Sequence, residues 1–495
     1  MDAHIQDTIQ KFKNLRVLVI GDFILDQYTD SDCNRLAPEA GVPVLQVTNQ
    51  TVCMGGAGNV VLNLCNLGAS VSYVTILGQD EAAKTAIRLL HESGVKELDV
   101  HFTDQSPTLQ KNRLRTEGRY LYRVDIGEGT VASPAVIDAY IQNIKKAYRA
   151  ADAIFVADYD KGNINEQVLE TLKNLQEEQD KVIAVDCKNY ERYKALHPTI
   201  IKPNYNEALS LLKAAPAANR VEQAVGWSGK FWDLTNSEIS VLSLDKDGVV
   251  VSNKGQLLFH YDVPEIDVVN VSGAGDTLLA SFLLAYLAGA STYDCAHIAC
   301  TAAGLAIKKS VTAHCTFGEL QLGLINLKDK VVDSLPDIGC LANALRDHKK
   351  IVFTNGCFDI FHSGHAKYLA QAKELGDILV VGVNNDQSVR RIKGNGRPVN
   401  RLNDRLEVLK QLSCVDYIVP FGEENDDTPI KLIETICPHV FVKGEDYKNG
   451  TLPEVDMLNE LGVQVEFMPY LPHQSTTKII DRVQKKDFVS LKKTS

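Results

Sequence analysis

The sequence predicts an α/β protein built from two consecutive domains. Its 495 residues exceed what a single hydrophobic core usually organises. Short apolar runs that end in a polar residue alternate with helical patterns, which is typical of parallel sheets flanked by helices. This alternation fades near Leu327 and resumes at residue 350. We therefore expect domains at residues 1–325 and 346–495, joined by a polar linker at 326–345.

The strands expected in the first domain end at a common edge of its sheet. They span residues 17–22, 71–78, 153–159, 181–186, 199–204 and 239–244. Four of these ends carry a polar side chain: Asp22, Asp158, Asp186 and Asn204. Because ligands bind beyond the carboxyl ends of parallel strands, we expect these side chains to face one crevice.

The composition favours a protein that handles small molecules in the cytoplasm. A net charge of −11 disfavours nucleic acid or an anionic membrane as the main partner. The longest apolar stretch, residues 278–290, is too short to span a bilayer, and the N-terminus lacks a signal-peptide layout. Eleven scattered cysteines without a C-x-x-C pair predict reduced thiols.

The stretch at residues 268–290 predicts a phosphate-handling helix start, with a strand, a glycine turn and a long apolar helix. Gly273 and Gly275 allow close backbone approach, and the free N–H groups of the helix start attract an anion. Asp276 in the first turn could be the base for an attacking hydroxyl. The alternative is that Asp276 only caps the helix.

Three further motifs give this stretch a family context. They are IGD at 20–22, GGAGN at 55–59 and PNYNE at 203–207. With GAGD at 273–276, this order and spacing resembles the ribokinase, or PfkB, family of sugar kinases over residues 12–320. The resemblance implies a doubly wound α/β domain with a small β lid, ATP as phosphoryl donor and Mg²⁺ as cofactor.

The resemblance also implies residue roles. Asp276 would be the catalytic base, and the amides from Gly273 through Ala274 to Gly275 would hold the transferred phosphoryl group. ATP would be bound by Asn204, Tyr205, Asn206 and Glu207, with Glu207 ordering Mg²⁺ indirectly. The sugar would be contacted by Asp22, Asp26, Gly55, Gly56 and Asn59.

Basic residues crowd the alternating segment at 107–125: Lys111, Arg113, Arg115, Arg119 and Arg123. Such a cluster could bind an anion through bidentate contacts. We expect Lys111 and Arg123 to contact a phosphorylated sugar. The alternative is a solvated strand face in the lid.

The second domain begins a new strand series, expected at 350–356, 378–384, 417–422, 439–444 and 465–469. TNGCFDIFHSGH (354–365) overlaps the first of these strands and leads into a helix. His362 and His365 share a face at that helix start, where they could bind the phosphates of a nucleotide. A zinc site is the alternative, but the pattern lacks a nearby cysteine pair or the Glu of H-E-x-x-H.

T-N-G-x-F-D followed by H-x-G-H is similar to the nucleotidyltransferase superfamily that includes the cytidylyltransferases. GVNNDQSVRRIKG (382–394), FVKGEDY (441–447) and STTKII (475–480) complete that family's set. The resemblance implies a Rossmann-like domain in which a sugar phosphate attacks the α-phosphate directly, with His362 and His365 as catalytic groups. The other expected nucleotide-binding residues are Thr354, Asn355, Gly356, Cys357, Phe358, Asp359, Lys393, Arg397, Lys443, Ser475, Thr476 and Thr477. Lys393, Arg397 and Lys443 would act as mobile cations for the triphosphate, and the hydroxyls at 475–477 would cap another helix start.

In this domain order, nearly the whole chain resembles the bifunctional kinase–adenylyltransferases of ADP-heptose biosynthesis, which serve the lipopolysaccharide core. The resemblance implies phosphorylation of D-glycero-β-D-manno-heptose 7-phosphate at C1. It also implies AMP transfer from ATP to heptose 1-phosphate, after a separate phosphatase has acted. We expect a homodimer with small-molecule substrates. Another phosphosugar, CTP in place of ATP, or a kinase domain that serves only dimerisation stay open as alternatives.

Overall fold

The computed structural model of the chain describes residues 3–264, 266–312, 314–324, 330–346, 349–424, 426–445 and 453–469. The chain separates into two compact units, with the division between Gly323 and Leu324. Each unit has its own parallel sheet flanked by helices, which confirms the predicted α/β class.

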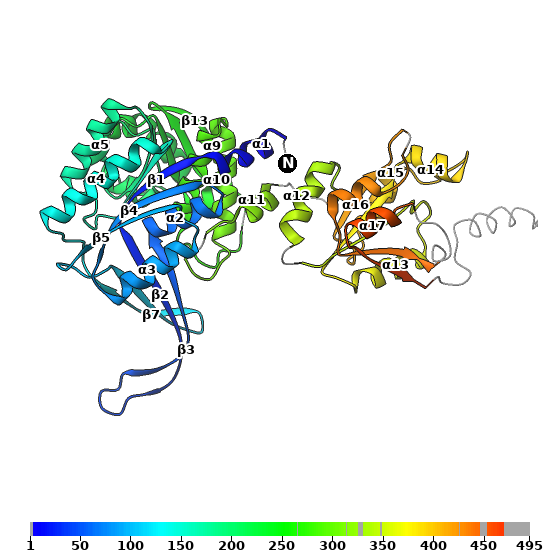
Figure 1. Ribbon diagram of the computed structural model, residues 1–495, viewed down its shortest axis with the longest axis horizontal. Helices are drawn as coiled ribbons and strands as arrows, with labels where there is room; N and C mark the ends of the chain where they lie inside the picture. Colours follow the sequence, from blue (N-terminus) through cyan, green and yellow to red (C-terminus); the bar gives the residue numbers. More distant parts are fainter. Residues whose placement is uncertain are drawn as a thin grey trace, which may run out of the picture. The chain divides into compact units, whose positions relative to one another are not determined.

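The apolar runs of the first unit form a sheet of order β13-β12-β11-β10-β9-β8-β1-β4-β5. Figure 1 shows β1, β4 and β5 following one another toward one edge of this sheet. From β5 to β11 the neighbouring strands are parallel, and β12 and β13 add an antiparallel edge. The strands are β1 (Arg16–Gly21), β4 (Ser70–Gly78), β5 (Glu97–Thr103), β8 (Ala153–Asp158), β9 (Val182–Cys187), β10 (Ile200–Ile201), β11 (Ile239–Ser243), β12 (Val249–Asn253) and β13 (Gln256–Tyr261). The order reverses at β1, so the ends of β1 and its neighbours frame the crevice where ligands bind in such sheets.

Helices cover both faces of this sheet, because alternate residues of its strands point to opposite sides. Leu18 and Ile20 of β1 pack against α4 and α5, whereas α2 and α9 pack together on the other side. The helix α9 is buried from Asp276 to Ala285, as its continuous apolar sequence requires. The helices are α1 (Ala3–Gln10), α2 (Ala57–Asn66), α3 (Glu81–Glu92), α4 (Pro134–Ala150), α5 (Glu166–Glu178), α6 (Tyr205–Leu212), α7 (Arg220–Val225), α8 (Ser228–Thr235), α9 (Ala274–Leu287), α10 (Thr292–Ala306) and α11 (Phe317–Leu324), with short 3₁₀ turns at Lys11–Asn14, Tyr190–Leu196 and Asp245–Asp247.

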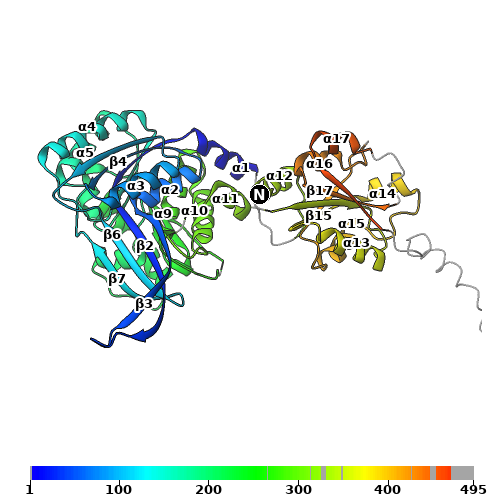
Figure 2. The same ribbon diagram turned by 60° about the horizontal axis from the view of Figure 1, so that its bottom comes forward.

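A second sheet of order β3-β2-β6-β7 extends from the first unit as a lid (Figure 2). It comprises β2 (Phe23–Leu36), β3 (Pro43–Gly56), β6 (Gln110–Thr116) and β7 (Arg119–Ile126). The β2–β3 pair is an antiparallel hairpin, and β6 runs parallel to β2. The small β lid implied by the family resemblance is therefore present.

The segment before the glycine turn differs from the prediction. Residues 268–272 form no strand, and Val271 is 70% exposed. The N–H groups of Val269 and Asn270 both donate to the carbonyl of Ile307. The β-branched residues favoured a strand, but this bonding ties the segment to the end of α10 instead of to a strand.

The second unit has a parallel sheet of order β16-β15-β14-β17-β18. Its strands are β14 (Ile351–Gly356), β15 (Ile378–Asn384), β16 (Tyr417–Phe421), β17 (Val440–Gly444) and β18 (Gln464–Met468), close to the five predicted ranges. Its helices are α12 (Leu335–Arg346), α13 (Ser363–Lys373), α14 (Asp386–Lys393), α15 (Leu402–Lys410), α16 (Ile430–Ile436) and α17 (Val455–Glu460). The order reverses at β14, so the segment after β14 lies at the expected ligand crevice.

The predicted linker is not a polar connector throughout. Residues 335–346 form α12, whose Ile338 and Leu341 are buried. The helix packs on α16 and β14, so it belongs to the second unit. Across the described ranges, no helix is both long and apolar enough to cross a membrane.

Candidate active sites

Asp276 lies in the first turn of α9 and is 9% exposed. Its Oδ2 accepts a hydrogen bond from Nδ2 of Asn59 at 2.8 Å, and its Oδ1 accepts one from the hydroxyl of Tyr159 at 2.5 Å. The N-cap of α9 is Gly273, without a side-chain cap bond, so Asp276 does not act as the cap. Burial, aided by the charge of Asp186, raises the pKa of Asp276 to about 6. The carboxylate is thus a stronger base than usual and remains ionised at neutral pH.

The glycines of this turn make room for a cation that the sequence analysis missed. Gly273 has a φ of 88°, which favours glycine, and starts the helix. A Cβ on Gly275 would lie 2.9 Å from Nζ of Lys202, which is buried after β10. Lys202 pairs with Asp186 at 3.4 Å. The N–H of Ala274 donates to the carbonyl of Val271 at 3.3 Å. A buried ammonium beside the start of α9 could attract a phosphoryl group.

The PNYNE motif begins α6 with a reciprocal cap. Oδ1 of Asn204 accepts the N–H of Glu207, and Oε2 of Glu207 accepts the N–H of Asn204, both at 2.9 Å. Burial and the nearby Asp186 raise the pKa of Glu207. Tyr205 stacks on Trp227 in the core of α6–α8, and its contact with ATP stays a prediction. The side chain of Asn206 is exposed.

The carboxylates of Asp186 and Glu207 fit a magnesium ion that is held mainly by substrate phosphates. Both carboxylates interact with the buried Lys202, which places them on the phosphate side of the site. Among the described residues, no three acidic, histidine or cysteine side chains gather closely enough to hold a metal alone. Mg²⁺ commonly needs only one or two carboxylates, because phosphates and waters complete its shell.

Asp26 and the glycines of GGAGN lie where β2 and β3 meet. Oδ1 of Asp26 accepts Nη1 of Arg113 at 2.7 Å, and Oδ2 accepts the hydroxyl of Thr312 at 3.0 Å. A Cβ on Gly55 would lie 2.4 Å from Oδ2 of Asp26, and one on Gly56 would lie 2.4 Å from the carbonyl of Asp22. Both glycines are therefore required by close packing, and a sugar contact by them stays a prediction.

Asp22 has a structural role that the sequence did not reveal. Its carboxylate is fully buried and accepts the N–H groups of Tyr159, Lys161 and Asn163 at 2.9–3.1 Å. Its carbonyl accepts the N–H of Ala57 at the start of α2. Its oxygens thus accept backbone hydrogen bonds, and a sugar contact by Asp22 stays a prediction.

The four polar strand ends do not all face one crevice. Asp158 is buried against Arg192 and the hydroxyl of Tyr193. Asp186 interacts with Lys202 and influences Asp276, so it does lie in the site. Parallel strands place these residues at one edge, but side-chain partners decide which of them reach the ligand.

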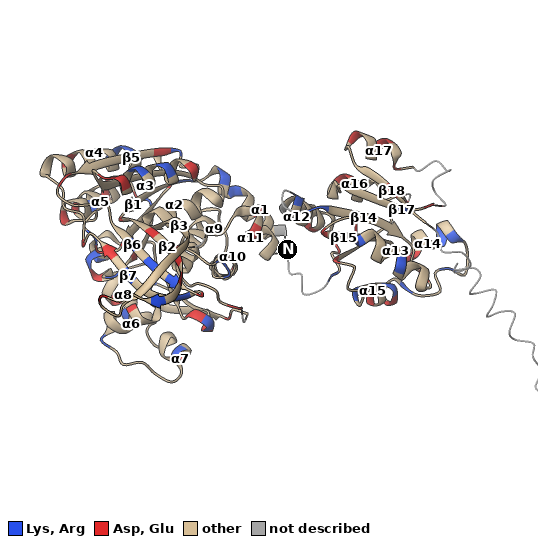
Figure 3. Cartoon of the chain, turned by 90° about the horizontal axis from the view of Figure 1, so that it is seen from below, with Lys and Arg blue, Asp and Glu red and all other residues tan. Residues whose placement is uncertain are grey.

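The basic segment of the lid is more than a solvated face. Lys111, Arg113 and Arg115 of β6 pair in register with Asp26, Tyr28 and Asp30 of β2, so charges of both signs lie side by side there (Figure 3). Burial lowers the pKa of Lys111. Arg123 lies on the exposed β7 and pairs with Asp125 at 2.5 Å. Lys111 is therefore the better placed of the two predicted phosphate contacts.

The paired histidines of the second unit lie at the start of α13, with His362 as its N-cap. Their rings stack with centroids 3.9 Å apart. Nδ1 of each ring is buried and has no hydrogen-bond partner in the described part of the chain. Burial lowers the pKa of both, that of His365 to about 4, so both are neutral. No further ligand for zinc joins them among the described residues.

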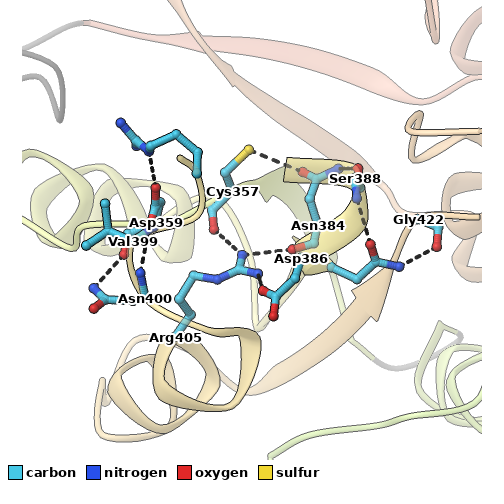
Figure 4. Close-up of polar contacts among 11 residues, drawn as sticks. Cys357, Asp359, Asn384, Asp386, Ser388, Val399, Asn400, Arg405 and Gly422 are labelled. Carbon is cyan, nitrogen blue, oxygen red and sulfur yellow. Dashed lines mark hydrogen bonds and ion pairs between the residues drawn. The ribbon is translucent and has the colours of Figure 1, made fainter. Parts of the chain in front are cut away.

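Asp359 fixes the loop that carries Arg397. It pairs with Nε of Arg397, and its Oδ1 accepts the N–H groups of Val399 and Asn400 at 2.7 and 3.0 Å (Figure 4). Arg397 is thus paired with Asp359, and its predicted role as a mobile cation stays a prediction. Its Nη2 is buried without a partner among the described residues, which leaves one donor for a ligand.

Arg405 of α15 is a further residue that the sequence analysis missed. Its side chain is fully buried, and it donates to the carbonyls of Cys357 and Asn384 and to Oδ1 of Asp386 (Figure 4). These three acceptors follow or end β14 and β15. Arg405 therefore joins the histidine loop to the start of α14.

The other predicted nucleotide residues are placed as follows. The hydroxyl of Thr354 is buried and donates to the carbonyl of Val442, and Oδ1 of Asn355 is buried without a described partner. Phe358, with a φ of 46°, packs its edge on His365. Lys443 pairs with the buried Glu454 at 3.6 Å, and its role as a mobile cation stays a prediction. Lys393 is exposed at the end of α14, Gly356 ends β14, and Ser475, Thr476 and Thr477 lie outside the described residues.

Comparison with known proteins agrees with this division. Residues 14–317 match the pfkB family of carbohydrate kinases, and residues 353–482 match the cytidylyltransferase-like family. The bifunctional protein HldE of Campylobacter concisus is 36% identical over 95% of this chain and 98% of its own length. HldE of Sulfurimonas denitrificans is 33% identical over 95% and 97%. The crystal structure of phosphofructokinase-2 from Escherichia coli covers 62% of this chain and 97% of its own, with 17% identity and a TM-score of 0.52, and supports the fold alone.

Proposed function

The chain belongs to the pfkB family of carbohydrate kinases and, over nearly its whole length, to the bifunctional HldE proteins, and from this premise we propose how its two sites act. It is an enzyme with a sugar kinase unit and a nucleotidyltransferase unit. One observation carries the proposal: a buried base at a helix start in one unit and two neutral histidines at a helix start in the other.

In the kinase unit, Asp276 accepts the proton of the sugar hydroxyl while the hydroxyl oxygen attacks the γ-phosphorus of ATP. The N–H groups of Gly273 and Gly275 and the ammonium of Lys202 stabilise the charge on the transferred phosphoryl group. Asp186 and Glu207 would hold Mg²⁺ through its phosphate-bound shell, where the ion neutralises charge on the phosphates. The intact arrangement around Asp276 disfavours a kinase domain that serves only dimerisation.

In the transferase unit, the phosphate of a sugar 1-phosphate attacks the α-phosphorus of the nucleotide, and pyrophosphate leaves. His362 and His365 donate hydrogen bonds to the α-phosphate as its negative charge rises. Nη2 of Arg397 and the exposed Lys393 contact the leaving phosphates. No residue needs to form a covalent intermediate, because this unit acts by positioning and charge neutralisation.

We propose heptose 7-phosphate as the sugar of the kinase and ATP as the nucleotide of both units. Lys111 is half-buried and lies in register with Asp26. It can therefore hold the remote phosphate of a phosphosugar while the acceptor hydroxyl of the sugar reaches Asp276. The products are the heptose 1,7-bisphosphate and, after removal of the 7-phosphate, ADP-heptose. A cytoplasmic location fits these soluble substrates and the free thiols of the described cysteines.

We also propose a homodimer formed through the lid. Tyr120, Tyr122 and Val124 of β7 are each at least half exposed, which gives an apolar strip on an edge strand. Tyr122→Glu should convert the dimer to a monomer in analytical ultracentrifugation. A wild-type chain that sediments as a monomer at micromolar concentration would refute the dimer.

A product assay tests the function. Purified heptose 7-phosphate and heptose 1-phosphate are each incubated with the full chain and with ATP or CTP, and products are identified by mass spectrometry. We expect the bisphosphate from the first sugar and ADP-heptose from the second, with ATP preferred over CTP. Absence of both products would refute the assigned sugar, and a CDP-sugar as main product would refute the assigned base.

A further inference from the structure

Tyr159 touches the reacting atom of the proposed kinase, although no sequence motif pointed to it. Its hydroxyl donates to Oδ1 of Asp276 at 2.5 Å. Burial raises the pKa of this hydroxyl well above its usual value, so it keeps its proton and acts as the donor. Asn59 holds the other carboxylate oxygen. Each oxygen of the base therefore accepts one hydrogen bond from the protein.

The two donors differ in how easily a substrate could displace them from the carboxylate of Asp276. Asn59 is fully buried on α2, and its backbone carbonyl accepts Nδ2 of Asn63 at 2.9 Å. Tyr159 lies in the loop after β8 and is only half-buried. Its backbone N–H donates to the carboxylate of Asp22 at 2.9 Å, so we assign its displacement to a rotation of the side chain alone. Tyr159 is thus the donor that a substrate can replace.

We propose that Tyr159 gates Asp276, occupying Oδ1 until the hydroxyl of the sugar displaces it. The proposal rests on the proposed kinase function. Asp276 is only 9% exposed, so the approach from which Tyr159 donates is the one that we assign to the sugar hydroxyl. On transfer, the sugar oxygen bonds to the γ-phosphorus, the bond to the bridging oxygen breaks with its electrons leaving on ADP, and the proton goes to Asp276.

The gate explains how ATP could be bound without being wasted. Water could attack the γ-phosphorus by the same route, with its proton passing to Asp276 and ADP and phosphate as products. Water is small and makes few contacts, so it cannot compensate for the lost bond between Tyr159 and Asp276. A sugar can do so, because its other hydroxyls and its phosphate supply binding energy.

The test is Tyr159→Phe in the full chain, which removes only the hydroxyl. We expect ADP release from ATP in the absence of sugar to rise about tenfold. This factor corresponds to the lower end of the free energy that one hydrogen bond to a charged group contributes. KM for the sugar should fall while kcat of sugar phosphorylation changes by less than about twofold. A purely structural role would not raise hydrolysis, so unchanged or lower ADP release in Tyr159→Phe overturns the gate.

Two controls separate this inference from the function beneath it. Tyr148→Phe removes another hydroxyl bonded at 2.5 Å, to Gln176, far from the base, and should leave ADP release unchanged. Asp276→Asn combined with Tyr159→Phe should abolish the extra hydrolysis. If Asp276→Asn still phosphorylates sugar, the assigned base is wrong. If it is inactive but Tyr159→Phe hydrolyses ATP like the wild type, only the gate is wrong.

Discussion

The base of the kinase unit has both oxygens occupied by Asn59 and Tyr159, whereas each histidine of the transferase unit keeps a buried Nδ1 without a described partner. Both sites lie at a helix start beyond the end of a parallel sheet. They differ in what the chemistry requires. The gate that we propose for Asp276 would keep water from the base until the sugar binds, whereas groups that only neutralise charge can wait unpaired for the phosphates.

The largest expected effect comes from substituting the catalytic residue of one active site while the other site is left intact. Asp276→Asn keeps the hydrogen-bonding shape but cannot accept a proton, so the kinase kcat should fall about 10³-fold. Nucleotidyl transfer by the same chain should be unchanged. His365→Ala should show the reverse pattern. Steady-state assays of both reactions on each variant measure this, and loss of both reactions in either variant would contradict two independent sites.

A second effect concerns how the transferase loop is held. Arg405→Met leaves two carbonyls without a donor and Asp386 without its cation, so the second unit should lose about 3 kcal/mol of stability. Transferase activity should then disappear at a lower urea concentration while kinase activity persists. Arg390→Met, on the exposed side of α14, is the matched control and should have no effect. Equal urea sensitivity of the two arginine variants would refute a role for Arg405.

The two sites should also differ in pH dependence. Asp276 must be deprotonated to act, and its pKa is raised to about 6, so kcat/KM of the kinase should fall about tenfold between pH 7 and pH 5. The pKa of His365 is lowered to about 4, so its charge does not change in that interval. Since both reactions use ATP, their ratio removes the titration of the nucleotide. A constant ratio from pH 7 to pH 5 would contradict the raised pKa of Asp276.

The smallest expected effect is on KM for the phosphosugar, and it distinguishes Lys111 from Arg123 as the phosphate contact of the lid. Arg123 is exposed and already paired with Asp125, so Arg123→Ala should change KM for the phosphosugar by less than about threefold. Lys111→Ala should raise KM about tenfold, because a half-buried ammonium binds phosphate with less competition from water. Equal KM values for the two variants would show that the lid binds the phosphate elsewhere.

The fold could be predicted well because the positions of strands and helix starts depend mainly on residues that are close together in the sequence. Apolar runs bounded by glycine or polar turns fixed the strands around β1 and β14, and Gly273 marked the helix start that carries Asp276. The segment at 268–272 was mispredicted because valine content alone does not supply a neighbouring strand. The hairpin β2–β3 was missed because its outer half is polar and exposed.

Of the two sites, only the residues that lie within recognisable motifs could be predicted from the sequence. Residue type marked Asp359 and Arg397 as polar groups near a nucleotide, but not that they bind each other. Lys202, Tyr159 and Arg405 act through partners distant in sequence, so no spacing rule could reveal them. Lys202 does stand directly before PNYNE, and a buried cation between a strand and that motif was the one available signal.

Asp22 has a consequence for how accurately the kinase base can be aimed. Its carboxylate anchors the loop of Tyr159, and its carbonyl anchors the start of α2, which carries Asn59. The next residue, Phe23, begins the lid. Asp22, at the base of the lid, therefore anchors the segments that carry both hydrogen-bond donors to Asp276. A movement of the outer lid strands should for this reason leave the orientation of the Asp276 carboxylate unchanged.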